Sequence, residues 1–249
     1  MKRDDLARYL DDLLCATNYR DYCPNGLQVE GRPEVRRVVF GVSACQALLD
    51  AAVAKGADAL LVHHGWFWRG EDGRVTGVRK ARLKTLLEHD ISLFAYHLPL
   101  DGHPELGNNA RLAGRFGWSV EGRFGDDNLG CHGRLPTPVS PEALAAQLAD
   151  GLGRKPLLVG GEMGRPIERI AWCTGGAQGY FEKAILLGVD AFVTGEISEY
   201  NVHLARETGV AFYSAGHHAT ERFGVQALAS HLATHCEVEC EYIDIDNPV

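Results

Sequence analysis

The sequence lacks any long apolar run. No stretch of the 249 residues approaches the roughly 20 apolar residues that a membrane-spanning helix needs. The first residues, MKRDDLARYLDDLL, carry acids where a secretory signal would have an uninterrupted apolar segment. These absences argue against a membrane or secreted protein, and we expect a cytoplasmic one.

Positive charge and paired cysteines are also scarce. The 25 Lys and Arg residues against 33 Asp and Glu give a net charge of −8, which argues against nucleic-acid binding as the main activity, although a local basic site stays open. The seven cysteines are odd in number and form no CxxC pair. We therefore expect mostly reduced, buried thiols rather than a disulfide framework or a cysteine zinc site.

Short apolar segments alternate with amphipathic ones along the whole chain. This alternation predicts an α/β protein with largely parallel sheets covered by helices. The predicted strands lie at 36–44, 57–64, 91–97, 168–176, 189–196 and 210–216, and the main predicted helices at 45–56, 78–90, 178–188, 198–209 and 217–235.

The chain contains a weak internal repeat. When it is shifted by 132 residues, 37–65 overlies 169–197 without a gap, Asp58 meets Asp190 and His64 meets Glu196. A shift of 120 places His97 on His217. We therefore predict two similar, interlinked α/β domains, 1–125 and 126–249, with the boundary in the Gly- and Pro-rich stretch 122–140.

Imidazoles and carboxylates gather at the predicted carboxyl ends of the strands, where open α/β sheets bind their ligands. They are His63, His64, His97 with Asp101 four residues later, Glu196, and His217 with Glu221 four residues later. Each histidine alone could equally be a hydrogen-bonded structural residue. Together, nitrogen and carboxylate donors at one sheet edge favour divalent transition ions such as Zn, Mn, Fe or Ni.

Spacing refines this prediction. His217 and Glu221 are four residues apart at the start of a predicted helix, so both can face one point. In HLPLD, Pro99 argues against a helix, and we expect a loop to bring His97 and Asp101 together. The adjacent His63 and His64 should point to opposite sides of their strand. They therefore suit two ions better than one, with Asp101 and Glu221 as carboxylate bridges.

Three other motifs point less clearly to a function. The turn CTGGAQG (173–179) could cradle a phosphate or be a plain turn. Trp66, Phe67 and Trp68 could stack against a flat heterocycle, or serve packing or a subunit contact. CPNGLQVEG (23–31) contains the tight-turn pair Asn25-Gly26 and shows no obvious chemistry.

Over nearly its full length the chain resembles the Nif-three-like proteins, also called GTP cyclohydrolase I type 2 homologues and, in bacteria, the YbgI group. The resemblance rests on CPNGLQVEG, GADALLVHHGWFW, YHLPLDGHPELGNN, CTGG, DAFVTGE and GHHATE. It implies a toroidal homohexamer with two divalent metal ions per subunit. The implied metal ligands are His63, His64, Asp101, His217 and Glu221, with His97 and Glu196 nearby. The connection between the halves is too short for the insertion that some relatives carry.

These observations lead to one leading hypothesis and two alternatives. We expect a metal-dependent hydrolase of a nucleotide-like or pterin-like small molecule, in which two cations activate water and His97 or Glu196 transfers protons. For GTP, attack at C8 would open the imidazole ring of the purine. The alternatives are a non-enzymatic protein that binds, delivers or scaffolds metal, and a metal-dependent phosphoesterase.

Overall fold

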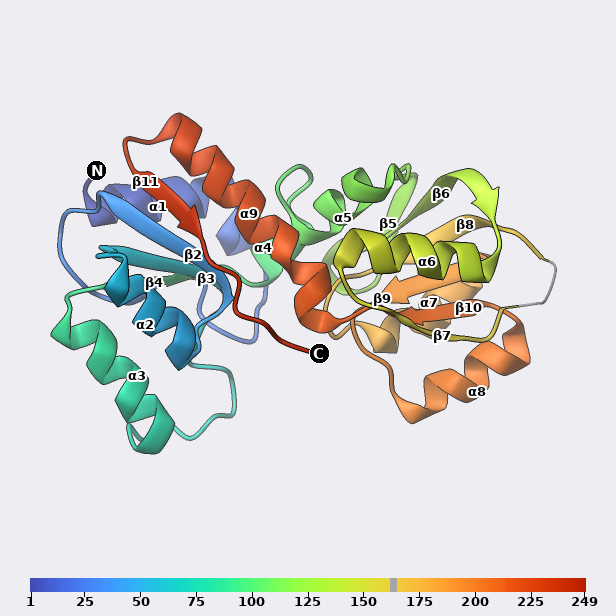
Figure 1. Ribbon diagram of the computed structural model, residues 1–249, viewed down its shortest axis with the longest axis horizontal. Helices are drawn as coiled ribbons and strands as arrows, with labels where there is room; N and C mark the ends of the chain where they lie inside the picture. The colour runs from blue at the N-terminus through green and yellow to red at the C-terminus, as the bar shows by residue number, and fades with distance from the viewer. Residues whose placement is uncertain (162–164) are drawn as a thin grey trace. The chain divides into compact units, whose positions relative to one another are not determined.

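The computed structural model describes residues 1–161 and 165–249, and in it the chain forms two compact units. Unit 1 comprises Met1–Leu106 and Gly224–Asp246, and unit 2 comprises Gly107–Phe223 and Asn247–Val249. Each unit is built on one sheet covered by helices, as Figure 1 shows. The predicted α/β class is confirmed.

Unit 1 contains a five-stranded sheet in the order β1-β4-β3-β2-β11. Its strands are β1 (Gly26–Val29), β2 (Arg37–Ser43), β3 (Ala59–His64), β4 (Ser92–Ala95) and β11 (Glu239–Tyr242). All neighbouring strands run parallel except β1, which is antiparallel to β4. The carboxyl ends of β3 and β4 therefore lie at the same edge of this sheet, as the sequence predicted.

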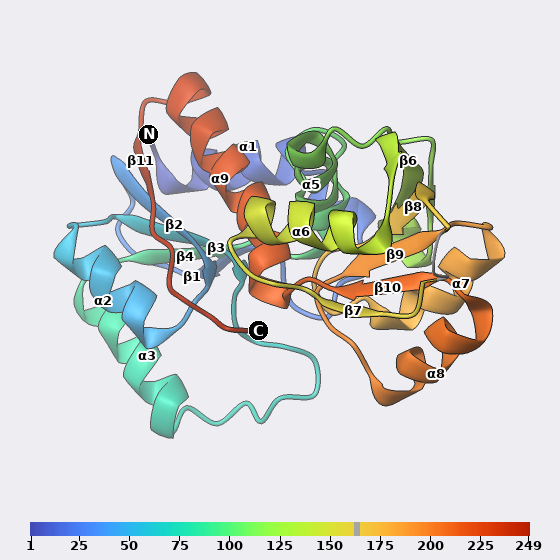
Figure 2. The ribbon, with the colours of Figure 1, turned by 45° about the vertical axis from the view of Figure 1, so that its right-hand side comes forward.

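Helices cover both faces of the unit 1 sheet (Figures 1 and 2). On one face, α1 (Arg3–Leu13) and the later part of α9 (His217–His235) pack on Val38, Phe40 and Val42 of β2. On the other face, α2 (Gln46–Ala54) and α3 (Gly77–Glu88) pack around Val39. Successive residues of β2 thus serve opposite cores, because strand side chains alternate. The remaining helical segments of unit 1 are η1 (Ala16–Asn18) and α4 (Leu98–Gly102).

Unit 2 contains a six-stranded sheet in the order β5-β6-β8-β9-β10-β7. Its strands are β5 (Gly122–Phe124), β6 (Gly130–Val139), β7 (Leu157–Val159), β8 (Ile167–Trp172), β9 (Ala191–Thr194) and β10 (Ala211–Ser214). Only β8, β9 and β10 are parallel neighbours, and the other three pairings are antiparallel. The expectation of largely parallel sheets therefore holds for unit 1, whereas the unit 2 sheet is mixed.

The unit 2 sheet is also covered by helices. Its helical segments are α5 (Asn108–Phe116), η2 (Asp126–Asn128), α6 (Pro141–Leu152), η3 (Gln178–Tyr180), α7 (Phe181–Leu186) and α8 (Glu199–Thr208), with the first residues of α9. Leu144, Leu148 and Leu152 of α6 pack with Trp172 and Tyr213 of the sheet.

The units do not follow the predicted halves 1–125 and 126–249. The stretch 122–140, expected as the boundary, contains the whole of β5 and β6. Pro136 and Pro138 are tolerated in β6 because they fall where its register with β8 shifts. The chain also returns to unit 1 after Phe223, since β11 pairs with β2. Strand pairing, rather than sequence order, sets the boundaries.

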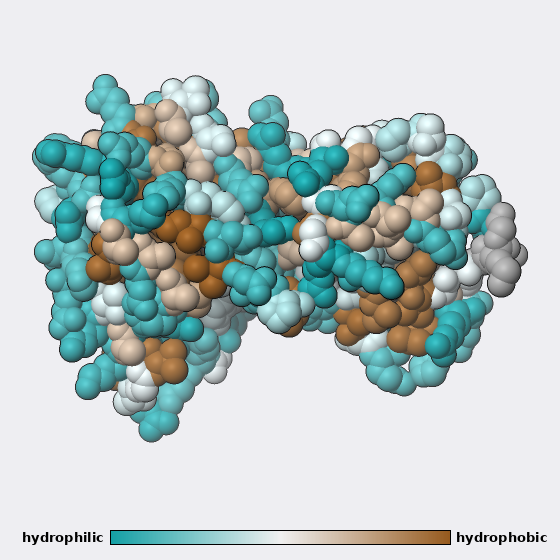
Figure 3. All heavy atoms as spheres, viewed as in Figure 1, coloured by the Kyte–Doolittle hydropathy of each residue, from teal (hydrophilic) through white to brown (hydrophobic). Residues whose placement is uncertain are grey.

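Two composition-based expectations can be compared with the structure. Among the described residues, no helix combines the length and apolar character needed to cross a bilayer. All seven cysteines are free thiols, of which Cys23, Cys131 and Cys173 are buried and Cys15 is exposed. On the face drawn in Figure 3, hydrophilic side chains are spread over both units, with smaller hydrophobic areas between them.

Candidate metal-ligand groups

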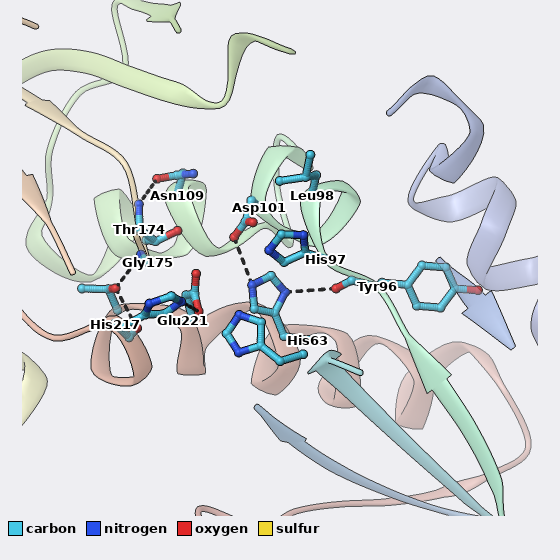
Figure 4. Close-up of polar contacts among 12 residues, drawn as sticks. His63, Tyr96, His97, Leu98, Asp101, Asn109, Thr174, Gly175, His217 and Glu221 are labelled. Carbon is cyan, nitrogen blue, oxygen red and sulfur yellow. Dashed lines mark hydrogen bonds and ion pairs between the residues drawn. The ribbon is translucent and has the colours of Figure 1, made fainter. Parts of the chain in front are cut away.

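His63 lies at the end of β3 and is completely buried. Its Nδ1 is 3.0 Å from the carbonyl oxygen of Tyr96, and its Nε2 is 3.5 Å from Oδ1 of Asp101 (Figure 4). A carbonyl oxygen can only accept a hydrogen bond, so Nδ1 carries the proton and Nε2 keeps its lone pair. That is the arrangement in which a histidine binds a metal ion.

His64 comes close to its neighbour despite the alternation of the strand. The ring centroids of His63 and His64 are 4.5 Å apart, and one nitrogen from each of His63, His64 and His97 lies within 4.8 Å of the others. The expected separation to opposite sides is thus not seen in the rings, because alternation fixes the Cβ directions and β3 ends at His64. Nδ1 of His64 is 3.1 Å from Oγ of Ser43 on β2.

His97 follows β4 and is held by a loop near the start of the chain. Its Nδ1 is 2.7 Å from Oδ1 of Asp21, and its backbone N–H donates to Oδ1 of Asn25 at 2.8 Å. The Asp21 carboxylate also accepts from Asn25 and from the backbone N–H of Leu98. Burial opposes the ionisation of Asp21, but these hydrogen bonds outweigh it and lower the Asp21 pKa to about 2.

Asp101 reaches His63 through a short helix, which corrects the prediction of a loop in HLPLD. Helix α4 begins at Leu98, with Pro99 in its first turn, and the N–H groups of Leu100 and Asp101 donate to the His97 carbonyl. Proline is tolerated there because a first-turn N–H has no partner within the helix. His63, His64, His97 and Asp101 form the unit 1 ligand group.

Glu196, His217 and Glu221 form the unit 2 ligand group. Nδ1 of His217 is 2.7 Å from Oε1 of Glu196, and its Nε2 is 3.1 Å from Oε2 of the buried Glu221. His217 is the first residue of α9, so the four-residue spacing places His217 and Glu221 one turn apart, as predicted. Burial opposes protonation of His217, but hydrogen bonds and charges from Glu221 and Glu196 raise its pKa to about 9.

The turn CTGGAQG supports Glu221 rather than offering a phosphate cradle. Four of its backbone N–H groups are already engaged, since Cys173 donates to the Val193 carbonyl and Thr174, Gly175 and Ala177 donate to the side chains of Asn109, Thr220 and Thr194. Gly175 has φ +69°, and a Cβ there would overlap Oε1 of Glu221. Only glycine lets the backbone approach this carboxylate so closely. The structure therefore favours the turn interpretation over the cradle.

The chemistry of both groups fits divalent metal ions. His63, His64, His97 and His217 each have Nδ1 within hydrogen-bonding distance of an oxygen, from Tyr96, Ser43, Asp21 and Glu196 respectively. Hydrogen bonds at Nδ1 orient an imidazole, as is usual for histidines that bind a metal through Nε2. Imidazole nitrogens with carboxylate oxygens suit Zn, Mn, Fe or Ni. All seven residues singled out in the sequence fall in these two groups.

Sequence reasoning missed the residues that orient these side chains. Asp21 and Asn25 contact His97 from the segment around CPNGLQVEG, which had shown no obvious chemistry, and only the Asn25-Gly26 turn signal marked it. Cys23 also lies within 4.8 Å of Asp21 and His97. Burial and the charge of Asp21 raise the Cys23 pKa to about 12, so it is a protonated thiol rather than a nucleophile.

Known proteins resemble this chain in sequence and in structure. It is 57% identical over 248 residues to a Pseudomonas aeruginosa protein named GTP cyclohydrolase 1 type 2 homolog, covering 98% of this chain and 96% of the relative. An Escherichia coli K12 protein of the same name is 50% identical over all of both chains. The solved structure of the protein ybgI, described as of unknown function, has a TM-score of 0.98 at 49% identity and full coverage of both chains.

A second solved structure, a Thermus thermophilus protein, has a TM-score of 0.90 at 38% identity and covers both chains fully. The family model described as Duf34/NIF3 (NGG1p interacting factor 3) matches residues 1–248. Because this match spans nearly the whole chain, and relatives at 50–57% identity cover at least 96% of both sequences, the protein belongs to the Duf34/NIF3 family.

Proposed function

We propose that this protein is a metal-dependent hydrolase of a nucleotide-like or pterin-like small molecule. One observation carries the proposal. Four imidazoles have Nδ1 within hydrogen-bonding distance of an oxygen, and the Nε2 atoms of His63 and His217 lie 3.5 Å and 3.1 Å from the carboxylates of Asp101 and Glu221, a combination of nitrogen and oxygen donors that divalent ions bind. The relatives named GTP cyclohydrolase 1 type 2 homolog support the choice of substrate class.

The proposed metal ligands are His63, His64 and Asp101 of unit 1 and His217 and Glu221 of unit 2. Following the sequence expectation, we propose that the two sets serve one pair of divalent ions. When bound, such ions lower the pKa of water and stabilise developing negative charge. The buried carboxylates supply negative charge that compensates the cations.

His97 is the residue that we propose transfers protons. Asp21 accepts the Nδ1 hydrogen of His97, so Nε2 is the basic atom, and the buried hydrogen bonds at Asp21 and Asn25 fix the orientation of the ring. Glu196 is the weaker candidate, because its Oε1 is already engaged by Nδ1 of His217 and its Oε2 lies 3.4 Å from Nε2 of Gln178. We assign Glu196 to orienting His217.

The metal assignment is tested by composition and by anomalous scattering. Glu221→Gln should keep the fold yet lose at least one ion per chain, because a neutral amide is a poor metal ligand. The matched control is Glu199→Gln, whose exposed carboxylate lies one helix away on α8. Full metal content in Glu221→Gln would contradict the assignment. Anomalous scattering at several absorption edges would report whether both ligand sets hold the same ions.

The activity is tested by loading the protein with Zn, Mn, Fe or Ni in turn and supplying GTP, other nucleotides and pterins. A ring-opened base would support the cyclohydrolase reaction, whereas released inorganic phosphate would assign a phosphoesterase instead. If the protein bound metal tightly and exchangeably but formed no product from a broad panel of metabolites, the proposed hydrolase activity would be wrong. A metal-binding or metal-delivery role would then be favoured.

We also propose that the chain assembles into a homohexamer, as the family resemblance implies. Light scattering after size exclusion should then give a mass about six times the 27.2 kDa of the chain. A mass near that of a single chain at micromolar concentration would contradict it.

A further inference from the structure

Two loops of unit 1 are joined beside His97. The backbone N–H of Trp66 donates to Oε1 of Gln28 at 2.7 Å, and Nε2 of Gln28 donates back to the Trp66 carbonyl at 3.0 Å. Three residues on, the N–H of Arg69 donates to the carbonyl of Tyr22 at 2.7 Å. Gly65 permits this approach, because a Cβ there would overlap Oε1 of Gln28. The loop 20–25, together with the strand β1 that follows it, and the loop 65–70 therefore form one structural element.

The aromatic residues on these loops divide into a packed one and three at the surface. Trp66 is buried, and its indole N–H donates to the Ala44 carbonyl at 2.9 Å, so it serves the core. Tyr22 is 57% exposed and Phe67 is 39% exposed, while Trp68 is half-buried. Of the two interpretations of Trp66–Trp68, packing applies to Trp66, whereas Phe67 and Trp68 keep surface exposed to solvent.

Tyr22 and Trp68 both contact the His97 ring. The Trp68 ring meets His97 edge-on, with centroids 5.0 Å apart, and the Tyr22 ring centroid lies 6.4 Å from that of His97. Trp68 also lies 6.1 Å from His64. Exposed aromatic rings thus border the imidazoles that we propose hold metal and transfer protons.

Phe67 has an unusual backbone conformation for a bulky residue. Its φ is +66°, in the left-handed region, which costs a non-glycine residue roughly 1–2 kcal/mol. The Phe67 side chain is nevertheless 39% exposed. Backbone strain of this kind is concentrated at functional positions.

We infer that Tyr22, Phe67 and Trp68, the aromatic surface, bind a planar fused heterocycle carrying a lactam edge, the chemistry shared by guanine and pterin. Such a ring gains stacking energy against exposed aromatic faces. Its polar edge would then lie within reach of His97. The inference rests on the proposed function for the choice of ring, but binding itself needs neither metal nor turnover.

The test uses the indole N–H signals of the four tryptophans in an NMR titration of the metal-free protein with guanosine and, separately, with pterin. The Trp68 signal, identified by its loss in Trp68→Phe, should shift with at least one of the two rings. The signals of Trp118 and Trp172, which are buried in unit 2, should stay in place. Guanosine and pterin given separately tell which of the two ring types is preferred.

Variants test the surface directly. Tyr22→Ala and Trp68→Ala should each weaken ring binding about tenfold, within the range measured for one stacked base. Tyr200→Ala is the matched control, because Tyr200 is 45% exposed on α8 and outside the aromatic surface, and it should bind as the wild type does. Backbone amide spectra show whether each variant is folded.

Three outcomes would overturn the inference. They are an unmoved Trp68 signal at millimolar concentrations of both rings, an equal shift with ribose alone, and unchanged affinity in folded Tyr22→Ala and Trp68→Ala. Each is separable from failure of the proposed function. A protein without any turnover could still bind the ring, and an active hydrolase whose Trp68 signal did not move would refute this inference alone.

Discussion

Units 1 and 2 have the same core and differ at the ends of their strands. The order β1-β4-β3-β2 in unit 1 corresponds to β7-β10-β9-β8 in unit 2, with the first strand of each series antiparallel to the second and the rest parallel. Asp58 accepts the N–H groups of Arg36 and Arg37 and pairs with Arg32. Asp190 accepts the N–H groups of Glu168 and Arg169 and pairs with Arg165.

The carboxyl ends of the strands have diverged. At equivalent positions, Ser43 contacts His64 in unit 1, while Gly175 makes room for Glu221 in unit 2. Unit 1 supplies three imidazoles and unit 2 supplies one imidazole between two carboxylates. The two units therefore share the aspartate that accepts hydrogen bonds from the start of the neighbouring strand. They differ at the carboxyl ends of the strands, where the proposed chemistry lies.

The largest effect is expected from removing the carboxylates that the two units share. Asp58→Ala and Asp190→Ala should each lower the free energy of unfolding by about 3 kcal/mol, because each leaves two backbone N–H groups and an arginine without their acceptor. Urea denaturation checks this. The controls are Asp50→Ala and Glu182→Ala, the equivalent exposed acids on α2 and α7, which should change stability by less than about 0.5 kcal/mol.

If either Asp58 or Asp190 tolerated alanine at a cost below about 1 kcal/mol, the two units would be equivalent only in the course of their backbones. The two units would then share a chain path without sharing the interaction that stabilises it.

A second prediction concerns the diverged pair Ser43 and Gly175. Gly175→Ala should cost about 2 kcal/mol, because alanine at positive φ is strained. Its Cβ would also displace Glu221, so metal content should fall. Ser43→Ala loses only a hydrogen bond to His64 and should cost about 1 kcal/mol. Elemental analysis and denaturation report both effects, and wild-type metal content in Gly175→Ala would show that the close approach to Glu221 is dispensable.

Much of this fold could be predicted because its signals are local. Apolar runs followed by Gly56 and Gly188 located α2 and α7, and the gap-free register of Asp58 on Asp190 identified equivalent strands. The shift of 120 residues, which placed His97 on His217, is too large by one residue. Ser92 pairs with Ala59 where Ala211 pairs with Ala191, so the pairing aligns His97 with Gly216 rather than His217. Short strands with few identities cannot fix a register that the hydrogen bonds decide.

The features that were not predicted depend on contacts between distant segments. Asp21 meets His97 across 76 residues, and no periodic pattern links an isolated acid in a polar loop to that histidine. The pairing of β11 with β2 is likewise set by the sheet and not by the local sequence of 239–242. The candidate metal-ligand residues themselves were predictable, because parallel strands bring their carboxyl ends to one edge.

A third prediction compares the two acids that orient histidines. The Asp21 side chain is 3% exposed and that of Glu196 is 37% exposed. Asp21→Asn should therefore cost about 2 kcal/mol at pH 7, whereas Glu196→Gln should cost less than about 1 kcal/mol. Because folding lowers the Asp21 pKa from 3.8 to about 2, its contribution is complete above pH 3.8 and is lost as the pH falls through 2.

Denaturation at several pH values checks the sign. The stability difference between wild type and Asp21→Asn should shrink to about half at pH 3, while at pH 5 and above it should be constant. A difference that grew on acidification would mean that Asp21 is not held as a carboxylate by His97.

The smallest expected effect is a difference in backbone strain between the connections that follow β3 and β9. After β3, Phe67 has φ +66°, whereas after β9 the chain enters α8 through a capping box at Ser198. At position 67, glycine should therefore be more stable than alanine by about 1 kcal/mol, because alanine keeps the strain that glycine lacks. At Tyr200 in α8 the order should reverse, with alanine more stable than glycine by up to about 1 kcal/mol. Thermal denaturation of the four variants measures both differences, and alanine more stable than glycine at position 67 would mean that this position carries no strain.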